Sequence, residues 1–479
     1  MMETRAESGG GHAPFPRGRS GTGTYPPQRW RAWVRPPYSA VLVVLGLGAV
    51  AALWTIGPGA PHAPWAPALL RGYVVAWVCY LAAAVLVTRT RALPRWALAW
   101  IVAVALALRV ASLLHAPVMS TDSFRYLWDG RVTDAGINPY RYAPDAPELR
   151  KLRDENWRMS FKDIRTLYPP GAELLFAGLA PLRSRDRGAF AWSFTLFDLG
   201  TVLLLIGLLR RTGRAAERVI WYAWCPLAAV ETAAGCHVDA VGLFFLALAL
   251  WLLARRTSPG PGSALAYTAA IMAKGPAVVT LPLFVAREGR RFLAIFLGVS
   301  ALLVAPFLGA GGKLFSGLGY YLGYWETNSS VFFLLHRVLD SALGVKSEVG
   351  FTPTIALHSA IIRAFTTLAL VALLVWLIRR RRSDPEWLIG STFTVLAAAL
   401  LLGAPTLPWY VIWTIPLLCW WPVAGWVAFT LTVFVQYYAR WVHSDWYPLP
   451  LLLGYVPVYA LLVWQWVKWR KEAGVLAPP

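Results

Sequence analysis

Charged residues are scarce in this chain of 479 residues, and acidic residues are scarcer than basic ones. Only 14% of the residues are charged and 57% are hydrophobic, which excludes an ordinary water-soluble enzyme of this length. Lys and Arg outnumber Asp and Glu by 45 to 24, for a net charge of +21. The basic residues cluster in short connections between apolar runs, as the positive-inside rule requires, so the charge does not indicate nucleic acid as a partner.

Cysteine is also rare. The four cysteines, Cys79, Cys225, Cys236 and Cys419, lie in or beside apolar segments and have no CxxC spacing. This pattern indicates neither a zinc site nor a disulfide framework.

Long apolar runs, by contrast, are abundant, and most approach the roughly 20 residues that a helix needs to cross a bilayer. The sequence therefore predicts an all-α, polytopic integral membrane protein with about fourteen transmembrane helices. The segment 263–287 counts as two half-helices, because Lys274-Gly275-Pro276 interrupts it. The other predicted spans are 38–57, 68–88, 97–115, 189–209, 219–234, 238–254, 291–308, 355–378, 386–402, 409–421, 423–440 and 448–466.

The basic connections set the expected orientation. Arg89, Arg91 and Arg95 lie between the second and third spans, which predicts that both termini are cytoplasmic and that 116–188 is outside. The expected regions are a disordered cytoplasmic tail (1–37), an N-terminal transmembrane hairpin (38–96), a central module (97–353) and a C-terminal transmembrane bundle (354–479). The central module carries two outer loops, 116–188 and 309–353.

The first outer loop contains a polar segment, 120–170, which follows the third span directly. Eight of the 24 acidic residues lie in it. Long ordered loops usually carry function, so we expect this segment to form the acceptor side of a membrane-embedded active site. Further polar residues recur at other outer turns, in AVETAAGCHVDAVG, YWETNSS and TLPWY.

An ordered set of motifs extends over most of the chain: YLWDGRVTDAGINPYRYAP, TLYPPGAELLF, CPLAAVETAAGCHVDAVGLFFLALAL, AAIMAKGPAVVTLPLF, YWETNSSVFFLL and TLPWYVIWTIPL. This set resembles the GT-C class of polytopic glycosyltransferases. It is most similar to bacterial polyprenol-phosphate-mannose-dependent mannosyltransferases and, more distantly, to the first mannosyltransferase of GPI-anchor synthesis. Many relatives carry two adjacent carboxylates where this chain has Thr121-Asp122-Ser123, so the use of a divalent metal ion is left open.

The resemblance implies an inverting transfer of one sugar, with mannose as the first expectation, in the plasma membrane on its non-cytoplasmic side. The donor would be a polyprenyl-phosphate sugar, and the acceptor a hydroxyl group of a glycan or a lipid-linked molecule. The central module 97–353 would then be the GT-C-like catalytic module.

Two carboxylates are candidates for catalysis. Asp122 follows the third span at the outer surface, where partial desolvation suits a general base that takes the acceptor's proton. The alternative role of Asp122 is a helix cap or a partner for Arg125. Asp129 lies two helical turns further on and is the second candidate, with capping or pairing to Arg125 or Arg131 as its alternative.

The donor phosphate needs cations and hydrogen-bond donors, for which Lys274, His237 and Asp239 are the candidates. A Lys at this position also fits a snorkelling residue, and the turn that holds His237 and Asp239 also fits a closed structural turn. Sugar binding favours aromatic rings mixed with amides and carboxylates. The candidates are Trp325, Glu326, Asn328, Trp409 and Tyr410; an interfacial aromatic belt is the alternative in a chain with 26 tryptophans.

Other classes remain open. A lipid-linked-sugar flippase or a secondary transporter would also be polytopic, and the interrupted helix at Lys274 resembles the discontinuous helices of transporters. A glycan polymerase or ligase would differ by taking lipid-diphosphate donors. The long acidic outer loop favours the glycosyltransferase.

Overall fold

The computed structural model describes residues 37–56, 66–90, 92–154, 157–182, 187–254, 260–344, 353–437 and 449–475. Within these ranges the secondary structure is helical, apart from an isolated bridge between Thr327 and Pro405. The all-α prediction is therefore confirmed for the described part of the chain. The predicted cytoplasmic tail, except Pro37, lies outside the described residues.

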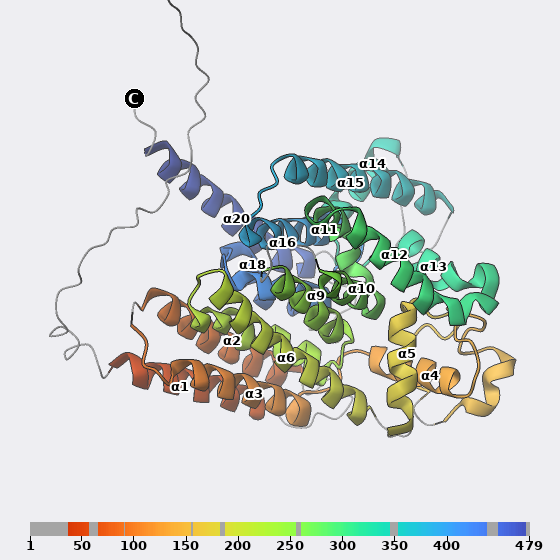
Figure 1. Cartoon of the computed structure of the whole chain (residues 1–479), viewed down its shortest axis with the longest axis horizontal. Coiled ribbons are helices and arrows are strands. Elements are labelled where there is room, and N and C mark those ends of the chain that lie inside the picture. The colour runs from red at the N-terminus through yellow and green to blue at the C-terminus, as the bar shows by residue number, and fades with distance from the viewer. Residues whose placement is uncertain are drawn as a thin grey trace, which may run out of the picture.

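The α-helices and short 3-10 or π turns (η) follow one another along the chain, with labels as in Figure 1. They are α1 (Pro37–Trp54), α2 (Ala66–Arg89), α3 (Ala97–His115), α4 (Asp122–Asp134), η3 (Pro147–Leu152), α5 (Pro170–Leu179), η4 (Ala180–Leu182), α6 (Gly188–Arg211), η5 (Ala216–Val219), α7 (Ile220–Ala223), α8 (Pro226–Ala229), η6 (Val230–Ala234), α9 (Asp239–Leu253), α10 (Pro261–Ala273), η7 (Gly275–Thr280), α11 (Leu281–Glu288), α12 (Arg290–Val304), η8 (Ala305–Phe315), α13 (Ser316–Tyr324), α14 (Val331–Leu343), α15 (Pro353–Arg379), α16 (Pro385–Leu402), α17 (Pro408–Val411), η9 (Ile415–Cys419), α18 (Ala424–Thr432) and α20 (Leu449–Val475).

Seven helices of the described residues are long and apolar enough to cross a membrane. They span Pro67–Arg89, Ala97–His115, Gly188–Arg211, Arg290–Tyr324, Leu357–Arg379, Pro385–Leu402 and Leu449–Lys471. Four shorter apolar helices accompany them: Tyr38–Trp54, Pro170–Leu182, Asp239–Leu253 and Ala424–Tyr437. The chain is thus a multi-pass membrane protein, while the number of fourteen spans stays a prediction.

Two of the predicted spans are not single helices, and here the prediction is wrong. The segment 219–234 consists of the end of η5 and three short pieces, α7, α8 and η6, and the segment 409–421 consists of most of α17 and η9. Proline accompanies both breaks: Pro226 keeps the preceding Cys225 in an extended conformation, and Pro416 is the second residue of the 3-10 turn η9. The predicted interruption at Lys274 is confirmed, because α10 ends at Ala273 and Lys274 itself is extended.

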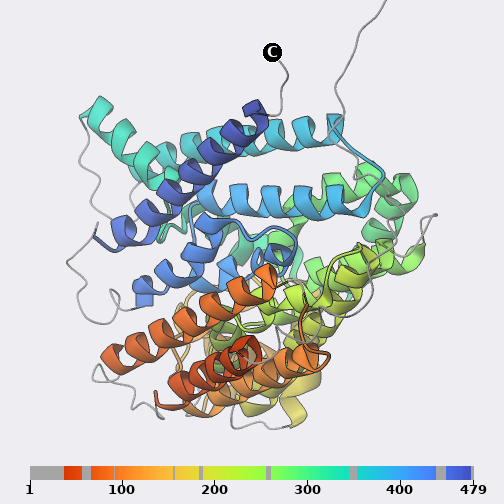
Figure 2. The same cartoon turned by 90° about the vertical axis from the view of Figure 1, so that its left-hand side faces the viewer.

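The N-terminal and C-terminal helices form two halves of the molecule (Figures 1 and 2). In Figure 2 the helices α1, α2 and α3 lie in the lower half, and α15, α16 and α20 lie in the upper half. Helices α9 and α10 pack on each other, and α6 packs on α9. The segment predicted as the first outer loop is folded, with α4 and α5 packed together at one end of the molecule.

A buried ion pair joins α3 to α6. Arg109 Nε lies 2.7 Å from Asp198 Oδ2, and both side chains are fully buried. Arg109 also donates to the carbonyl of Ala223, and the Tyr222 hydroxyl donates to Asp198. Because both charges are paired and hydrogen-bonded, the membrane-embedded core can contain them.

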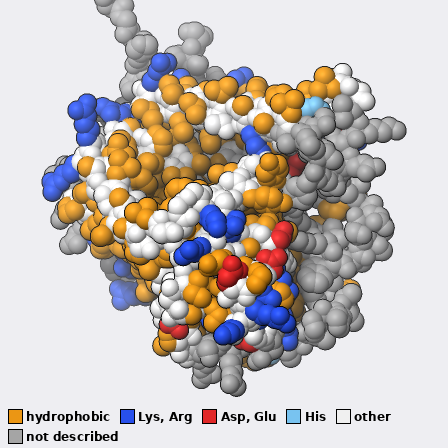
Figure 3. Space-filling view, turned by 90° about the vertical axis from the view of Figure 1, so that its right-hand side faces the viewer, with side chains coloured by type: hydrophobic (Ala, Val, Ile, Leu, Met, Phe, Trp, Pro, Cys, Tyr) orange, Lys and Arg blue, Asp and Glu red, His pale blue; other side chains and the backbone are white. Residues whose placement is uncertain are grey.

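Helix α5 fixes the position of the polar segment relative to the membrane helices. A Cβ atom on Gly130 of α4 would lie 2.5 Å from the carbonyl oxygen of Phe176 on α5, and one on Gly171 of α5 would lie 2.7 Å from that of Met272 on α10. Glycine is therefore required for both close approaches. Figure 3 shows acidic and basic side chains gathered over the part of this face where α4 and α5 lie, with apolar side chains around them.

This packing gives the first prediction. Gly130→Ala pushes α4 away from α5, so we expect it to lower the free energy of unfolding by about 1–3 kcal/mol, as overpacking does. Gly178→Ala is the control, because its Cβ meets nothing within 4 Å. Thermal unfolding of both variants in detergent tests this. Equal stability of the two variants would contradict the close contact.

Candidate functional site

The site is built around the turn between η6 and α9. Residues Val230–Ala234 form one π turn, a feature that is frequent at functional sites. Cys236 then adopts a positive φ of 55°, which is uncommon for a residue other than glycine. This compact turn brings the side chains of Glu231, His237 and Asp239 close together, and all three are fully buried.

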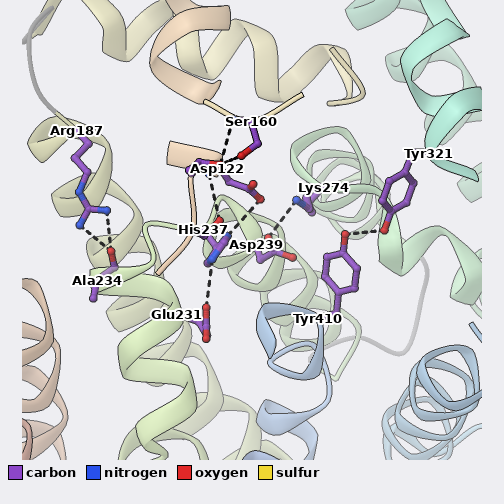
Figure 4. A network of polar contacts seen from close by, with 12 residues as sticks. Asp122, Ser160, Arg187, Glu231, Ala234, His237, Asp239, Lys274, Tyr321 and Tyr410 are labelled. Carbon is purple, nitrogen blue, oxygen red and sulfur yellow. Dashed lines mark hydrogen bonds and ion pairs between the residues drawn. The ribbon is translucent and has the colours of Figure 1, made fainter. Parts of the chain in front are cut away.

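The imidazole of His237 lies between two carboxylates (Figure 4). Its Nε2 lies 3.2 Å from Glu231 Oε2, and its Nδ1 lies 3.8 Å from Asp122 Oδ2. The ring also stacks on Trp409, with 4.1 Å between centroids and 16° between planes. Of the two carboxylates, Glu231 is fully buried whereas the side chain of Asp122 is 30% exposed. The imidazole thus connects an accessible carboxylate to a buried one.

Lys274 and Asp239 form a second pair beside the imidazole (Figure 4). Lys274 Nζ lies 3.4 Å from Asp239 Oδ2, and Trp413 Nε1 donates to Asp239 Oδ1 at 2.7 Å. Lys274 Nζ also lies 4.9 Å from the centre of the Tyr168 ring, which belongs to the polar segment. The extended backbone at Lys274 therefore presents a cation where the membrane helices meet α4 and α5.

Aromatic side chains continue the site toward the second predicted outer loop. The hydroxyl oxygens of Tyr321 and Tyr410 lie 2.6 Å apart (Figure 4), and the Tyr321 and Trp325 rings lie 5.6 Å apart. The Trp325 ring also contacts Phe161 of the polar segment, at 4.3 Å between centroids. We call Tyr321, Trp325, Trp409 and Tyr410 the aromatic wall. Three of its members, Trp325, Trp409 and Tyr410, were predicted from the sequence, and Tyr321 was not.

Glu326 and Asn328 hold their loop in place. Asn328 has a positive φ of 49°, and its side-chain amide donates to the carbonyl of Thr406 at 3.0 Å. Glu326 Oε2 lies 3.2 Å from His336 Nδ1, and Glu326 Oε1 accepts from the Ser329 hydroxyl. Their predicted contact with a sugar therefore stays a prediction, and their visible role is to shape the segment beside Trp325.

Asp129 occupies a separate environment. Both of its carboxylate oxygens accept from Arg125 Nε, at 2.9 and 2.8 Å, which is the pairing that the sequence left open. Burial raises the pKa of Asp129, and the charge of Arg125 opposes that shift. Burial, together with the charge of Asp129, raises the pKa of Glu173 well above its usual value, although Thr166 donates to it. The catalytic role of Asp129 stays a prediction.

Sequence reasoning did not assign three residues that contact the site. Glu231 is in the same motif as His237, and its short spacing to the histidine was an available signal. Trp413 and Tyr321 are two of many aromatic residues in apolar runs. Nothing in the sequence distinguishes them from an interfacial belt, because their partners are far away along the chain.

The environment of Asp129 gives the second prediction. Asp129→Asn leaves the guanidinium of Arg125, whose side chain is only 11% exposed, without its carboxylate, which costs about 3 kcal/mol where an ion pair is buried. Glu173→Gln is the matched control, because glutamine keeps an acceptor for Thr166 and the raised pKa of Glu173 favours its neutral form, which glutamine resembles. Thermal unfolding in detergent at pH 7 compares them. A larger loss in Glu173→Gln would contradict this assignment of charge.

Comparisons with known proteins give two matches to part of the chain. The family described as "Alpha-(1->6)-mannopyranosyltransferase, N-terminal domain" matches residues 28–288. Alpha-(1->6)-mannopyranosyltransferase A of Mycobacterium tuberculosis (strain ATCC 25618 / H37Rv) is 25% identical over 326 residues, which is 63% of this chain. The match spans 61% of that relative's length. No solved structure gives a significant match. The family match includes Asp122, His237, Asp239 and Lys274 but ends before the aromatic wall.

Proposed function

Because the chain belongs to the alpha-(1->6)-mannopyranosyltransferase family, we propose that it transfers one mannosyl residue from a polyprenyl-phosphate donor to a hydroxyl group of a glycan or lipid-linked acceptor. The transfer inverts the anomeric centre and takes place on the non-cytoplasmic side. The position of Asp122 carries the proposal: its carboxylate is partly exposed and lies 3.8 Å from His237, close to the pair formed by Lys274 and Asp239 (Figure 4).

The proposed reaction is a single displacement with Asp122 as general base. The Asp122 carboxylate takes the proton of the acceptor hydroxyl while its oxygen attacks the anomeric carbon. The new carbon–oxygen bond forms on the sugar face opposite the phosphate. The bond between the anomeric carbon and the phosphate oxygen breaks, and its electron pair leaves with the phosphate. The products are the extended acceptor and the polyprenyl phosphate, and the configuration is inverted.

His237 serves Asp122 rather than the phosphate in this scheme, because both of its ring nitrogens face carboxylates. Glu231 Oε2 lies 3.2 Å from Nε2; in this scheme Nε2 carries the ring proton, so that the unprotonated Nδ1 faces Asp122. After the transfer, Nδ1 accepts the proton from Asp122 and restores the base. Glu231 is therefore a positioning residue, and the stacked Trp409 ring fixes the plane of the imidazole.

The leaving phosphate needs a cation, and Lys274 supplies it. The ammonium group of Lys274 pairs with Asp239, and Trp413 donates a hydrogen bond to Asp239. This arrangement keeps a charged Lys274 in place within an apolar surrounding. The donor phosphate brings a further negative charge to the ammonium group, while the aromatic wall, with Trp325, Trp409 and Tyr410, lines the place of the sugar and lipid.

The proposed orientation is supported by contacts at the opposite end of the helices. Arg214 Nε lies 2.8 Å from Glu386 Oε1, which joins a connection predicted to be cytoplasmic to the predicted cytoplasmic start of the span 386–402. Other arginines of such connections donate to backbone carbonyls of neighbouring segments: Arg211 to Trp251, Arg218 to Cys419 and Arg381 to Ala286. A basic end of this kind is expected on the cytoplasmic side, which leaves the site on the other side and both termini in the cytoplasm.

A lipid-linked-sugar flippase or a secondary transporter is the second candidate. The observation that favours it is the interruption of α10 at Lys274, since discontinuous helices bind substrates in transporters. The purified chain is incubated in detergent with a panel of polyprenyl-phosphate sugars and a glycan that offers an acceptor hydroxyl. This separates the two classes, because a detergent solution has no membrane across which a substrate could be transported. Consumption of polyprenyl-phosphate mannose supports the transferase; no consumption of any donor by well-folded protein contradicts it.

The third prediction concerns the base. We expect Asp122→Asn to lower mannosyl transfer by about 10²- to 10⁴-fold, the usual contribution of a general base. Asp134→Asn, an exposed carboxylate on the same helix, should leave transfer unchanged. Transfer is measured with purified protein, and thermal unfolding confirms that both variants are folded. Full turnover in Asp122→Asn would reject its role.

The fourth prediction concerns the phosphate. We expect Lys274→Ala to raise the KM for the polyprenyl-phosphate donor by about tenfold to a hundredfold, since a charge-assisted contact is lost. The KM for the acceptor should not change. Lys313→Ala removes an exposed lysine of the second predicted outer loop and is the matched control. An unchanged donor KM in Lys274→Ala, or an equal effect in both variants, would remove Lys274 from the donor site.

A further inference from the structure

A second cluster of ionisable side chains lies between α14 and α15, apart from the site at Asp122. His336 and Asp340 are four residues apart on α14 and so share one face of that helix, and His358 comes from α15, which packs on α14. His358 Nδ1 lies 3.1 Å from Asp340 Oδ1, and His336 Nε2 lies 4.0 Å from the same oxygen. One donor atom from each side chain lies within 4.8 Å of the others, and all three residues are buried.

The ring of His336 points an unsatisfied nitrogen into this cluster. Its Nε2 is buried and makes no hydrogen bond to any described residue. Its other nitrogen, Nδ1, lies 3.2 Å from Glu326 Oε2. A histidine that binds a metal ion through one nitrogen usually gives the other to a carboxylate, which fixes the tautomer and aims the ligand atom. The contact between Glu326 and His336 has this form.

We propose that His336, Asp340 and His358 bind one divalent transition-metal ion, for which Zn²⁺ is the appropriate probe. Two imidazole nitrogens and one carboxylate oxygen suit Zn²⁺, whereas Mg²⁺ and Ca²⁺ prefer oxygen ligands alone. In a tetrahedral site with bonds of about 2.0–2.2 Å the ligand atoms lie about 3.3–3.6 Å apart. The 3.1 Å separation of His358 Nδ1 and Asp340 Oδ1 is close to this, and the 4.0 Å separation of His336 Nε2 and Asp340 Oδ1 must shorten slightly when the ion binds.

The ion would stabilise the second predicted outer loop, 309–353, rather than take part in the sugar transfer. It ties α14 to α15 directly, and through His336 it fixes Glu326, the neighbour of Trp325 in the aromatic wall. Helix α15 already contacts the residue next to Glu326, because Arg363 Nη2 donates to the carbonyl of Trp325 at 3.0 Å. A bound ion would therefore stabilise the loop that carries Trp325 next to Tyr321.

Metal content tests this proposal without any measurement of sugar transfer. The full-length chain is purified in detergent, stripped with a chelator, dialysed against Zn²⁺ or Co²⁺ and analysed by mass spectrometry for bound metal. We expect about one ion per chain, a visible absorption spectrum of Co²⁺ with nitrogen and oxygen ligands, and a higher Tm with Zn²⁺ than without it. His358→Gln and Asp340→Asn should lose the ion.

Two control variants make the assignment specific. His115→Gln removes a histidine of α3 that contacts the Trp54 ring, and Asp122→Asn changes the other site; both should keep the ion. Loss of the ion in Asp122→Asn, or its retention in a variant with both His358→Gln and Asp340→Asn, would overturn the proposal. If those two substitutions prevent folding, the unaltered chain decides: failure to bind Co²⁺ and to gain thermal stability with Zn²⁺ would equally overturn it.

Discussion

The position of the His237 imidazole between Asp122 and Glu231 is the contact on which the site depends. Asp122 begins α4, in the polar segment, whereas Glu231 and His237 belong to a buried turn between membrane helices. The 3.8 Å distance from His237 Nδ1 to Asp122 Oδ2 therefore joins the polar segment to the membrane helices, whereas the 3.2 Å contact with Glu231 lies within the turn. Without the contact between His237 and Asp122, the accessible carboxylate would have no fixed relation to Lys274.

Buried charge sets the second constraint. The described core contains the ion pair of Arg109 and Asp198, and the site contains the ion pair of Lys274 and Asp239. In each pair the carboxylate also accepts a hydrogen bond from a third residue, Tyr222 or Trp413. Pairing of this kind is how charged groups are retained in apolar surroundings. The two ion pairs differ in solvent exposure. The side chains of Arg109 and Asp198 are completely buried, whereas the side chain of Lys274 is 9% exposed and lies near the partly exposed Asp122.

The sequence predicted the features that depend on local chemistry. The resemblance to mannosyltransferases is confirmed by the family match, and Asp122 follows the third span as expected. The interruption at Lys274 followed from the Gly-Pro pair, but the break at Pro226 was missed, because an apolar run conceals it. The Trp413 contact with Asp239 could not be predicted, because it joins residues that lie far apart in the sequence and a tryptophan in a span resembles many others.

The central claim is that one site holds the lipid phosphate at Lys274 and the acceptor hydroxyl at Asp122. A structure of the chain with a non-cleavable polyprenyl-phosphonate mannose tests it most directly. We expect the phosphonate within hydrogen-bond distance of Lys274 Nζ, and the anomeric carbon on the side facing Asp122, with the sugar against the aromatic wall. A phosphonate bound away from Lys274, with Asp122 remote from the anomeric carbon, would contradict it.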